Sequence, residues 1–439
     1  FMEYKIGLIG DFILDKFIYH RATRLSPEGP VPVVQKLYET QAAGGSGNVS
    51  LSLDNLNCNV ELNYAYNPNF NKEIYDEIDK IFKKTSISLQ KVNIDIDIPI
   101  KTRYYVDNKL FMREDNEKNY EDNQNYIEDT FINKWLNDYD IVVISDYQKG
   151  FFSSESLRKL INECKRRNIP IFVDSKNKNP ECFRNCFCLK VNKVEFMELA
   201  RSSNLFDNKN LKLSQKIELL RKHLEISNFV VTLGAEGSIV SNKSGNIFSS
   251  ALNVEINDIT GAGDAFIAAL IKSTIDDPEF SVNRVCEYQI NEKQLIFANE
   301  ASSSVIIHKG TVPIQKHFLT NKKLKKRFGK IGFTNGCFDV LHLGHISLLK
   351  QAKAVCDYLI VGLNSDSSVK LLKGSNRPIH HEDVRLQILQ SLKFVDEVII
   401  FNELTPKKLI EQITPDYLIK GADYEEDEIV GSDFVKSYG

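Results

Sequence analysis

The segment Asp258-Ile-Thr-Gly-Ala-Gly-Asp-Ala-Phe266 joins a glycine-rich turn to an acid at the start of an apolar helical run. Glycines let neighbouring backbone N–H groups point toward one anion, and the positive end of the helix dipole adds to the attraction. An acid beside such a turn is electrostatically unfavourable unless it accepts a proton. Asp264 is therefore predicted to be the base that deprotonates an attacking hydroxyl in phosphoryl transfer. The alternative is that Asp264 only caps the helix.

Four shorter motifs support a phosphoryl-transfer site in the same part of the chain. Each is a turn or a polar pair beside an expected strand or helix, and each is weak alone. They are Gly10-Asp11 with Asp15, Gly44-Gly45 with Asn48, Asn192-Lys193-Val194-Glu195, and Thr232 with Gly234 and Gly237. Their order and spacing, rather than any single pair, support the prediction.

The segment Thr334-Asn-Gly-Cys-Phe-Asp-Val-Leu-His-Leu-Gly-His345 places two histidines three residues apart near the start of a helix. Residues at this spacing share one helix face, and Gly344 leaves room for a ligand at the backbone. Imidazoles at a helix N-terminus can bind the phosphates of a nucleoside triphosphate and stabilise charge on leaving pyrophosphate. His342 and His345 are therefore predicted to serve nucleotidyl transfer. Zinc, or a histidine pair of the core or surface, is the competing interpretation, but zinc lacks a third ligand nearby.

Lys373 lies on an expected mobile, glycine-flanked loop where its ammonium can meet phosphate. A loop lysine is otherwise usually only solvated.

Short apolar runs alternate with helical segments along the chain, which favours α/β architecture with mainly parallel sheets. The runs are Ile6–Ile9, Ile141–Ser145, Ile171–Val173, Phe229–Thr232, Lys330–Phe333, Tyr358–Gly362 and Glu397–Phe401. The segments 31–41 and 101–113 differ, and they predict exposed strands with a hairpin turn at Asp107-Asn108. We expect these strands to form a small lid sheet beside the large sheet.

A basic stretch at 313–330 contains seven Lys or Arg residues and no acid. Such a charge run is typical of a solvated linker. We therefore expect a first domain at 1–312, a linker at 313–329 and a second, smaller α/β domain at 330–439.

Composition excludes several classes of protein. The 439 residues carry 56 Lys and Arg against 59 Asp and Glu, a net charge of −3, which gives no reason to expect nucleic-acid binding. No apolar run reaches the ~18 residues of a membrane span, and the N-terminus opens on an expected strand rather than a signal peptide. The eight cysteines are sparse, and we expect buried free thiols in a reducing cytosol. The cluster of Cys182, Cys186 and Cys188 lacks a fourth ligand for zinc.

The order of the N-terminal motifs resembles that of the ribokinase-like sugar kinases, and the HxGH motif resembles the cytidylyltransferase-like nucleotidyltransferases. Together they resemble one family closely, the bifunctional heptose 7-phosphate kinase/heptose 1-phosphate adenylyltransferases. The resemblance covers nearly the whole chain, and it implies a ribokinase-like α/β domain with a small β lid followed by a Rossmann-like nucleotidyltransferase α/β domain. Its most specific segments are Arg24–Val34, Ser145–Gly150, Asp258–Phe266, Thr334–His345, Asn364–Pro378, Lys420–Tyr424 and Ile429–Ser432.

The resemblance also implies roles for individual residues. The catalytic residues would be Asp264 in the kinase and His342, His345 and Lys373 in the second domain. The substrate-binding residues would be Asp11, Asp15, Gly44, Gly45, Asn48, Arg103 and Asp339. The nucleotide-binding residues of the kinase would be Asn192, Lys193, Val194, Glu195, Thr232, Gly234, Gly237, Gly261, Ala262, Gly263 and Asn299. Those of the second domain would be Thr334, Asn335, Gly336, Cys337, Phe338, Gly344 and Asp423.

Two reactions are implied. In the first, ATP phosphorylates the anomeric hydroxyl of D-glycero-β-D-manno-heptose 7-phosphate. In the second, heptose 1-phosphate and ATP give ADP-heptose and pyrophosphate. ATP would be the co-substrate, and Mg²⁺ the cofactor, held near Glu195 through water and phosphates because it dehydrates reluctantly. A monovalent cation is a further candidate.

An enzyme of ADP-heptose supply to the lipopolysaccharide core is expected in a Gram-negative cytoplasm, with heptose phosphates and ATP as partners and neither nucleic acid nor membrane. The free edges of the lid strands favour a homodimer formed through the kinase lid.

Three segments depart from the family pattern. Asn67–Glu73 lacks the glycine–aspartate loop of many such kinases, and Lys190-Val-Asn192 replaces a more usual Thr-Pro-Asn. The chain stops at Gly439, before the further strand and helix N-terminus that bind triphosphate in the family, so we expect a C-terminally truncated second domain.

Two alternatives stay open. The same folds could act on another sugar phosphate or use CTP, because base choice is not readable from the sequence. The second domain could also be an inactive binding or scaffold domain. Intact Asp264, His342 and His345 argue against lost activity, whereas the short C-terminus argues for it in the second half.

Overall fold

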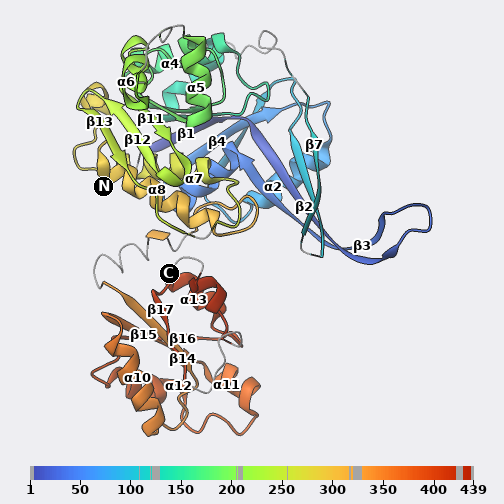
Figure 1. Cartoon of the computed structure of the whole chain (residues 1–439), viewed down its shortest axis with the longest axis vertical. Coiled ribbons are helices and arrows are strands. Elements are labelled where there is room, and N and C mark those ends of the chain that lie inside the picture. The colour runs from blue at the N-terminus through green and yellow to red at the C-terminus, as the bar shows by residue number, and fades with distance from the viewer. Residues whose placement is uncertain are drawn as a thin grey trace. The chain divides into compact units, whose positions relative to one another are not determined.

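The computed structural model describes residues 4–107, 109–118, 120, 129–203, 205, 211–254, 256–315, 318–319, 329–421 and 429–436. The chain divides into two compact units, Phe1–Gln315 and Lys316–Gly439, and each has its own sheets (Figure 1). The limits at 312 and 330 stay a prediction, because most of the expected linker lies outside the described residues.

The first unit is built on a nine-stranded sheet in the order β13-β12-β11-β10-β9-β8-β1-β4-β5. Neighbouring strands are parallel except at β12 and β13, which are antiparallel to their neighbours. The strands are β1 (Lys5–Gly10), β4 (Asn59–Tyr66), β5 (Ser88–Asn93), β8 (Ile141–Asp146), β9 (Ile171–Ser175), β10 (Cys188–Asn192), β11 (Asn228–Thr232), β12 (Ser238–Asn242) and β13 (Gly245–Ser249). The central strands are mostly apolar and buried because both faces of the sheet are covered.

Helices cover the two faces of this sheet. Figure 1 shows α4, α5 and α6 on one side and α7 and α8 on the other. The helices are α1 (Ser46–Asn55), α2 (Lys72–Phe82), α3 (Asp129–Trp135), α4 (Ser154–Arg166), α5 (Lys193–Ser202), α6 (Leu213–His223), α7 (Ala262–Ile275) and α8 (Glu292–Ile306). Residues Ala265–Ile271 of α7 are all buried, so this helix lies inside the unit and fixes the position of the turn that precedes it.

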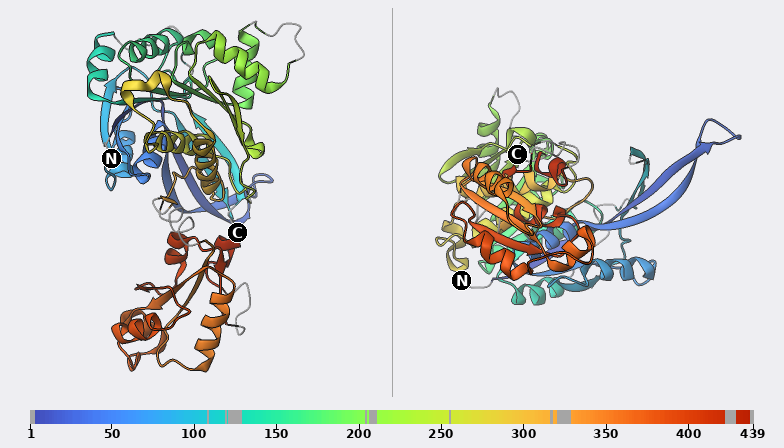
Figure 2. Two further views of the ribbon diagram at one scale, coloured as in Figure 1. Left: turned by 90° about the vertical axis from the view of Figure 1, so that its left-hand side faces the viewer. Right: turned by 90° about the horizontal axis from the view of Figure 1, so that it is seen from below.

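A second, four-stranded sheet forms the predicted lid, in the order β3-β2-β6-β7. Its strands are β2 (Phe12–Leu25), β3 (Pro32–Gly45), β6 (Ile100–Val106) and β7 (Lys109–Asn116). Figure 2 shows the β2–β3 ribbon extending far beyond the rest of its unit. The strands at 31–41 and 101–113 were predicted, whereas β2 was not, because its outer half is polar and exposed and carries no clear alternation of apolar residues.

The second unit contains a parallel sheet in the order β16-β15-β14-β17. The strands are β14 (Ile331–Gly336), β15 (Tyr358–Asn364), β16 (Glu397–Phe401) and β17 (Tyr417–Leu418), and the helices are α10 (Leu343–Ala354), α11 (Asp366–Lys373), α12 (Glu382–Gln390), α13 (Lys407–Ile413) and α14 (Ser432–Lys436). One hydrophobic cluster packs Ile331, Phe333 and Ile360 against α13, and another packs Leu359 and Leu363 against α10 and α12.

Within the described part of the chain, no helix is both long enough and apolar enough to cross a membrane. Cys182, Cys186 and Cys188 are buried free thiols, as predicted.

Candidate active sites

Asp264 lies in the first turn of α7, which begins directly after Gly261 in the left-handed conformation (φ 84°). The residue is 2% exposed, and its carboxylate accepts hydrogen bonds from Asn48 Nδ2 at 2.9 Å and from the Tyr147 hydroxyl at 2.6 Å. Burial raises the pKa of Asp264 to about 6, although both hydrogen bonds act in the opposite direction. A carboxylate held in this way is positioned to accept a proton from a bound hydroxyl.

The turn before Asp264 is closely packed. A Cβ on Gly261 would lie 2.8 Å from Asn48 Nδ2, and a Cβ on Gly263 would lie 2.9 Å from Lys190 Nζ. Ala262 is the first helical residue. The N–H groups in the first turn of a helix have no intrahelical partner, so this turn offers donors to an anion, although the Ala262 N–H already donates to the Ile259 backbone oxygen at 3.3 Å.

Asn48, in the first turn of α1, connects the sugar-site motifs to Asp264. Its Nδ2 donates to Asp264, whereas its Oδ1 is buried and has no hydrogen-bond partner among the residues that the structure describes. A buried acceptor without a donor is costly, and a substrate hydroxyl could supply one.

Asp11 directly follows β1 and is buried. Its carboxylate accepts hydrogen bonds from the backbone N–H groups of Tyr147, Lys149 and Phe151 at 2.8, 3.0 and 3.2 Å. Burial and the neighbouring Asp146 carboxylate nevertheless raise the pKa of Asp11. Asp11 thus positions the segment that carries Tyr147, and its predicted contact with the sugar stays a prediction.

Asp15 lies on β2, where the lid joins the large sheet. Its two oxygens accept hydrogen bonds from Arg103 Nη1 at 2.6 Å and from the Thr311 hydroxyl at 2.7 Å. Gly44 packs against this carboxylate, since a Cβ there would lie 2.6 Å from Asp15 Oδ2. Gly45 (φ 57°) packs equally closely, with a Cβ position 2.5 Å from the Asp11 backbone oxygen.

Asn192 and Glu195 cap the N-terminus of α5 reciprocally. Asn192 Oδ1 accepts from the backbone N–H groups of Val194 and Glu195, each at 2.9 Å, and Glu195 Oε2 accepts from the Asn192 N–H at 2.7 Å. Burial and the nearby Asp174 carboxylate raise the pKa of Glu195. A divalent cation beside Glu195 would relieve this repulsion, so the residues present fit a Mg²⁺ ion. In the described ranges, no three His, Cys, Asp or Glu side chains form a group that could hold a metal.

The other predicted nucleotide-binding residues surround the end of β11, whose last residue is Thr232. Gly234 and Gly237 follow, with φ values of 63° and 110°. A Cβ on Gly237 would lie 2.1 Å from the Ser249 backbone oxygen, so only glycine fits there. Asn299 on α8 donates to the same oxygen at 3.1 Å.

Lys193 connects α5 to this turn through an ion pair with Glu236 at 3.2 Å, and both side chains are exposed. Val194 is 69% exposed.

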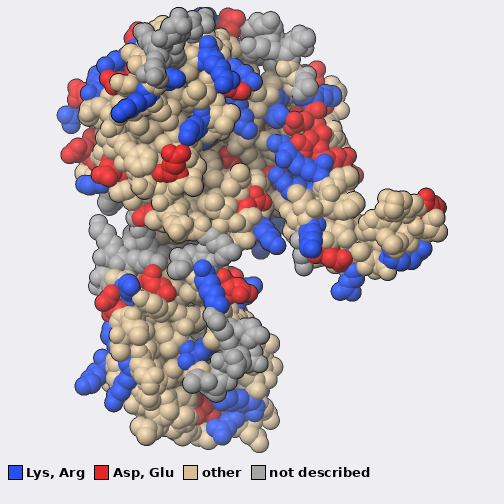
Figure 3. Space-filling model, in the orientation of Figure 1, with Lys and Arg blue, Asp and Glu red and all other residues tan. Residues whose placement is uncertain are grey.

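A basic group not predicted from the sequence lies where β6 and β7 leave the body of the first unit. Burial lowers the pKa of Lys101, and Lys149, Arg113 and Lys176 lower it further, while Glu117 opposes them. Figure 3 shows Lys and Arg side chains gathered beside β7. Arg113 pairs with Asp115 and Lys149 with Glu117, each at 2.6 Å. Basic side chains gathered in this way are suited to an anionic group of a substrate.

In the second unit, His342 and His345 lie at the N-terminus of α10 with their rings stacked, 3.8 Å between centroids. A Cβ on Gly344 would lie 3.0 Å from His342 Cε1. Burial lowers the pKa of His345, and the charges of His342 and Lys373 lower it further. The predicted loop position of Lys373 is wrong, because this residue ends α11 and Gly374 caps the helix. Lys373 lies within electrostatic reach of His345.

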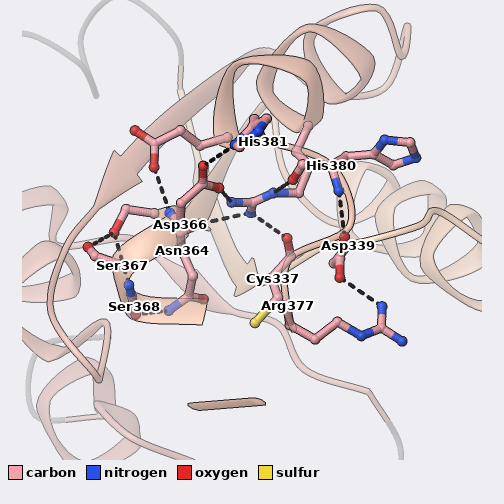
Figure 4. Close-up of polar contacts among 12 residues, drawn as sticks. Cys337, Asp339, Asn364, Asp366, Ser367, Ser368, Arg377, His380 and His381 are labelled. Carbon is pink, nitrogen blue, oxygen red and sulfur yellow. Dashed lines mark hydrogen bonds and ion pairs between the residues drawn. The ribbon is translucent and has the colours of Figure 1, made fainter. Parts of the chain in front are cut away.

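Arg385 on α12 holds the surrounding loops together and is 1% exposed. Its guanidinium donates to the backbone oxygens of Cys337, Asn364 and His380 at 2.7, 2.8 and 2.9 Å and to Asp366 Oδ1 at 2.7 Å (Figure 4). The strand ends and the α11–α12 connection are therefore tied to one buried cation.

Asp339 also contacts the segment between α11 and α12. It accepts hydrogen bonds from Arg377 Nη1 at 2.8 Å and from the backbone N–H groups of Ile379 and His380 at 2.8 and 3.2 Å (Figure 4). Although burial opposes it, these donors hold the pKa of Asp339 below its usual range. The structure thus shows a loop-positioning contact, while the predicted substrate contact is not tested.

The end of β14 carries the predicted nucleotide-binding residues 334–336. Thr334 Oγ1 is buried without a hydrogen-bond partner in the described part of the chain, and Asn335 Oδ1 accepts from Lys420 Nζ at 2.5 Å. Phe338 (φ 45°) is buried, with its ring centroid 5.2 Å from that of His345. Asp423 lies outside the described residues.

Sequence reasoning gave no role to four residues that organise the two sites: Tyr147, Asp174, Lys190 and Arg385, of which Lys190 and Arg385 are buried. Tyr147 lies in the specific segment Ser145–Gly150, which was its only signal. The contact of Lys190 with Asp174 joins two neighbouring strands, and Arg385 reaches Cys337 across 48 positions.

Two family descriptions match the two units. The pfkB family carbohydrate kinases match residues 14–316, and the cytidylyltransferase-like family matches residues 333–436.

Curated relatives match almost the whole chain. The bifunctional protein HldE of Campylobacter concisus (strain 13826) is 35% identical over 448 residues, which cover 98% of this chain and 93% of the relative. That of Helicobacter pylori (strain Shi470) is 34% identical over 447 residues, covering 98% and 94%. The chain belongs to the bifunctional HldE family. Membership of the HldE family confirms the predicted sugar kinase and nucleotidyltransferase of ADP-heptose biosynthesis.

A solved structure supports the fold of the kinase half of this HldE-family chain. The ribokinase of Thermotoga maritima superimposes with a TM-score of 0.51 and 18% identity, covering 72% of this chain and all of that one. The ribokinase-like fold with a lid and the cytidylyltransferase-like second domain are thus confirmed.

Proposed function

We propose that Asp264 is the base that deprotonates O1 of D-glycero-β-D-manno-heptose 7-phosphate while ATP phosphorylates it. The observation that supports this role best is the buried Asp264 carboxylate, held by Asn48 and Tyr147 at the N-terminus of α7. The O1–H proton passes to Asp264, an O1–P bond forms and the bond from the γ-phosphorus to the β-phosphate oxygen breaks, which releases ADP. The first-turn N–H groups of α7 offset charge on the transferred phosphoryl group.

ATP is the proposed co-substrate of both reactions, and Mg²⁺ is the proposed cofactor. Mg²⁺ would neutralise phosphate charge when bound. Glu195 would hold it through water, beside the cap that Asn192 forms on α5. A monovalent cation near the kinase site remains a further candidate.

The 7-phosphate of the sugar would meet the basic group formed by Lys101, Arg113, Lys149 and Lys176. Burial lowers the pKa of Lys101 most, and an added dianion would offset the repulsion from Lys149, Arg113 and Lys176 that lowers it further. Asn48 Oδ1, buried without a partner in the described ranges, would accept a hydrogen bond from a sugar hydroxyl.

In the second unit, we propose that heptose 1-phosphate attacks the α-phosphorus of ATP. A bond forms from the sugar phosphate oxygen to that phosphorus, and the bond to the β-phosphate oxygen breaks, which releases pyrophosphate. His342, His345 and Lys373 would stabilise the charge that leaves with pyrophosphate. The lowered pKa of His345 favours its neutral ring, which can still donate one N–H hydrogen bond to phosphate.

We further propose that the enzyme acts in the cytoplasm as a homodimer that pairs through the lid, without nucleic acid or membrane. The lid supports this proposal with exposed apolar side chains, including Leu37 and Tyr38 on β3 and Phe111 on β7.

The test is a substrate panel on the full chain. Sugar 7-phosphates and sugar 1-phosphates are supplied separately with ATP or CTP, and ADP and pyrophosphate release are measured. We expect ADP release with heptose 7-phosphate and ATP, and pyrophosphate release with heptose 1-phosphate and ATP. A preference for another sugar or for CTP would contradict the substrate assignment, and absent pyrophosphate release would indicate a second unit that only binds.

A further inference from the structure

Lys190 places a buried ammonium group inside the proposed kinase site. It lies on β10 two residues before the N-cap of α5, and it is 4% exposed. Its Nζ forms an ion pair with Asp174 Oδ2 at 2.7 Å. Burying a charged group is costly, so such a group is kept where it has a partner or a task.

The position of Nζ coincides with the anion-binding turn. A Cβ on Gly263 would lie 2.9 Å from Nζ, so the missing side chain of this glycine leaves the room that the ammonium occupies. Gly263 immediately precedes Asp264. The lysine thus contacts the helix terminus at Gly263, whereas Asn48 contacts it at Gly261, where a Cβ would lie 2.8 Å from Asn48 Nδ2.

Lys190 brings a positive charge to a turn that is otherwise surrounded by carboxylates. Asp174, Glu195 and Asp264 all act electrostatically on this lysine. An ammonium group has three N–H donors. The hydrogen bond to Asp174 uses one of them. A phosphoryl group that enters between Asp264 and ATP would bring further negative charge to this turn.

This chain has Lys190-Val-Asn192 where the motif that it resembles more usually has Thr-Pro-Asn. A threonine carries no charge, so this chain has an additional cation at the site.

We propose that Lys190 binds the transferred phosphoryl group and that Asp174 positions its ammonium. This inference rests on the proposed kinase function. As the O1–P bond forms and the bond to the leaving ADP oxygen breaks, Lys190 offsets charge on the phosphoryl oxygens, while Asp264 takes the O1 proton. Lys190 keeps its own proton throughout.

The test compares Lys190→Met with wild type in the full chain. A matched control is Lys222→Met, which removes an exposed lysine on α6 that pairs with Glu218 at 2.6 Å. We expect Lys190→Met to lower kcat for phosphorylation of heptose 7-phosphate about 100-fold, as for loss of one transition-state donor, with little change in the KM of the sugar. Adenylyl transfer by the same protein and the control variant keep wild-type rates.

A binding measurement separates phosphoryl contact from a structural ion pair. With heptose 7-phosphate present, calorimetry compares ADP alone with ADP plus aluminium fluoride, which mimics the phosphoryl group in transfer. Lys190→Met should weaken the second complex about 100-fold and the first less than about threefold. Lys190→Gln, which can still hydrogen-bond Asp174, should behave in the same way and serves if the methionine variant does not fold.

Equal loss of both complexes, or kcat within about threefold of wild type, would overturn the proposal and leave Lys190 as a structural partner of Asp174. If wild-type protein itself fails to phosphorylate heptose 7-phosphate, the proposed function fails instead.

Discussion

At the level of single residues, the proposed kinase site contains a carboxylate whose proton affinity the fold has changed. Asp264 is buried beside Tyr147 and Asn48, and burial raises its pKa to about 6. A base with a pKa near the working pH is ionised at neutral pH yet basic enough to accept a proton.

Replacing Asp264 by Asn should lower kcat for phosphorylation about 1,000-fold, because the amide cannot accept the O1 proton. Pyrophosphate release by the second unit should be unchanged. Asp276→Asn, at the C-cap of the same helix, is the matched control and should keep full activity. Near-normal turnover of Asp264→Asn would refute the base assignment.

The fall of kinase activity at acid pH should reflect the titration of Asp264. Below a pH of about 6, protonated Asp264 cannot act as a base, so kcat should fall about tenfold per pH unit. Tyr147→Phe removes a hydrogen bond that favours the carboxylate, so it should move this limb upward by roughly one pH unit. An unchanged limb in that variant would show that another group controls the profile.

At the level of elements, the lid is an open four-stranded sheet. Its long strands β2 and β3 pair antiparallel from Phe12 with Gly45 to Leu25 with Pro32. The inner ends bury Asp15 and Gly44 at the proposed sugar site, whereas the outer ends expose apolar side chains. Open edges with apolar surface favour pairing with a second sheet.

Leu37→Glu should therefore shift the protein from dimer to monomer in light scattering. Leu37 is 54% exposed on β3, and a carboxylate there would be buried without a partner in a lid-to-lid interface. Leu219→Glu, on a 40% exposed leucine of α6, is the control and should leave the molar mass unchanged. A wild-type protein that is monodisperse as a monomer at micromolar concentration would contradict the lid dimer.

At the level of the whole molecule, each unit carries its own sheet, core and candidate site. Asp264→Asn and His345→Ala should then each abolish one reaction and spare the other. Mixed together with heptose 7-phosphate, ATP and a phosphatase that removes the 7-phosphate, the two variants should restore ADP-heptose to within about threefold of the wild-type rate. Either variant alone should make none, and a mixture that stays inactive would show that the two units are coupled.

The sequence predicted a feature correctly where one short segment contains all the residues that form it. The turn at 261–264 and the histidines at 342 and 345 each lie at a helix N-terminus, as their glycines and spacing indicated. The apolar runs also became strands of the expected type. Strand β2 was missed because its pairing with β3 and β6, rather than its own composition, makes it a strand.

The sequence alone therefore determined the two families, the α/β class and the two motifs, because these depend on residue types at short, regular spacing. Only the tertiary structure decided which side chains meet them. Tyr147 reaches Asp264 across 117 positions, and Lys190 reaches Asp174 from a neighbouring parallel strand. Burial, which raises the pKa of Asp264, depends on every element packed around it and has no local signal in the chain.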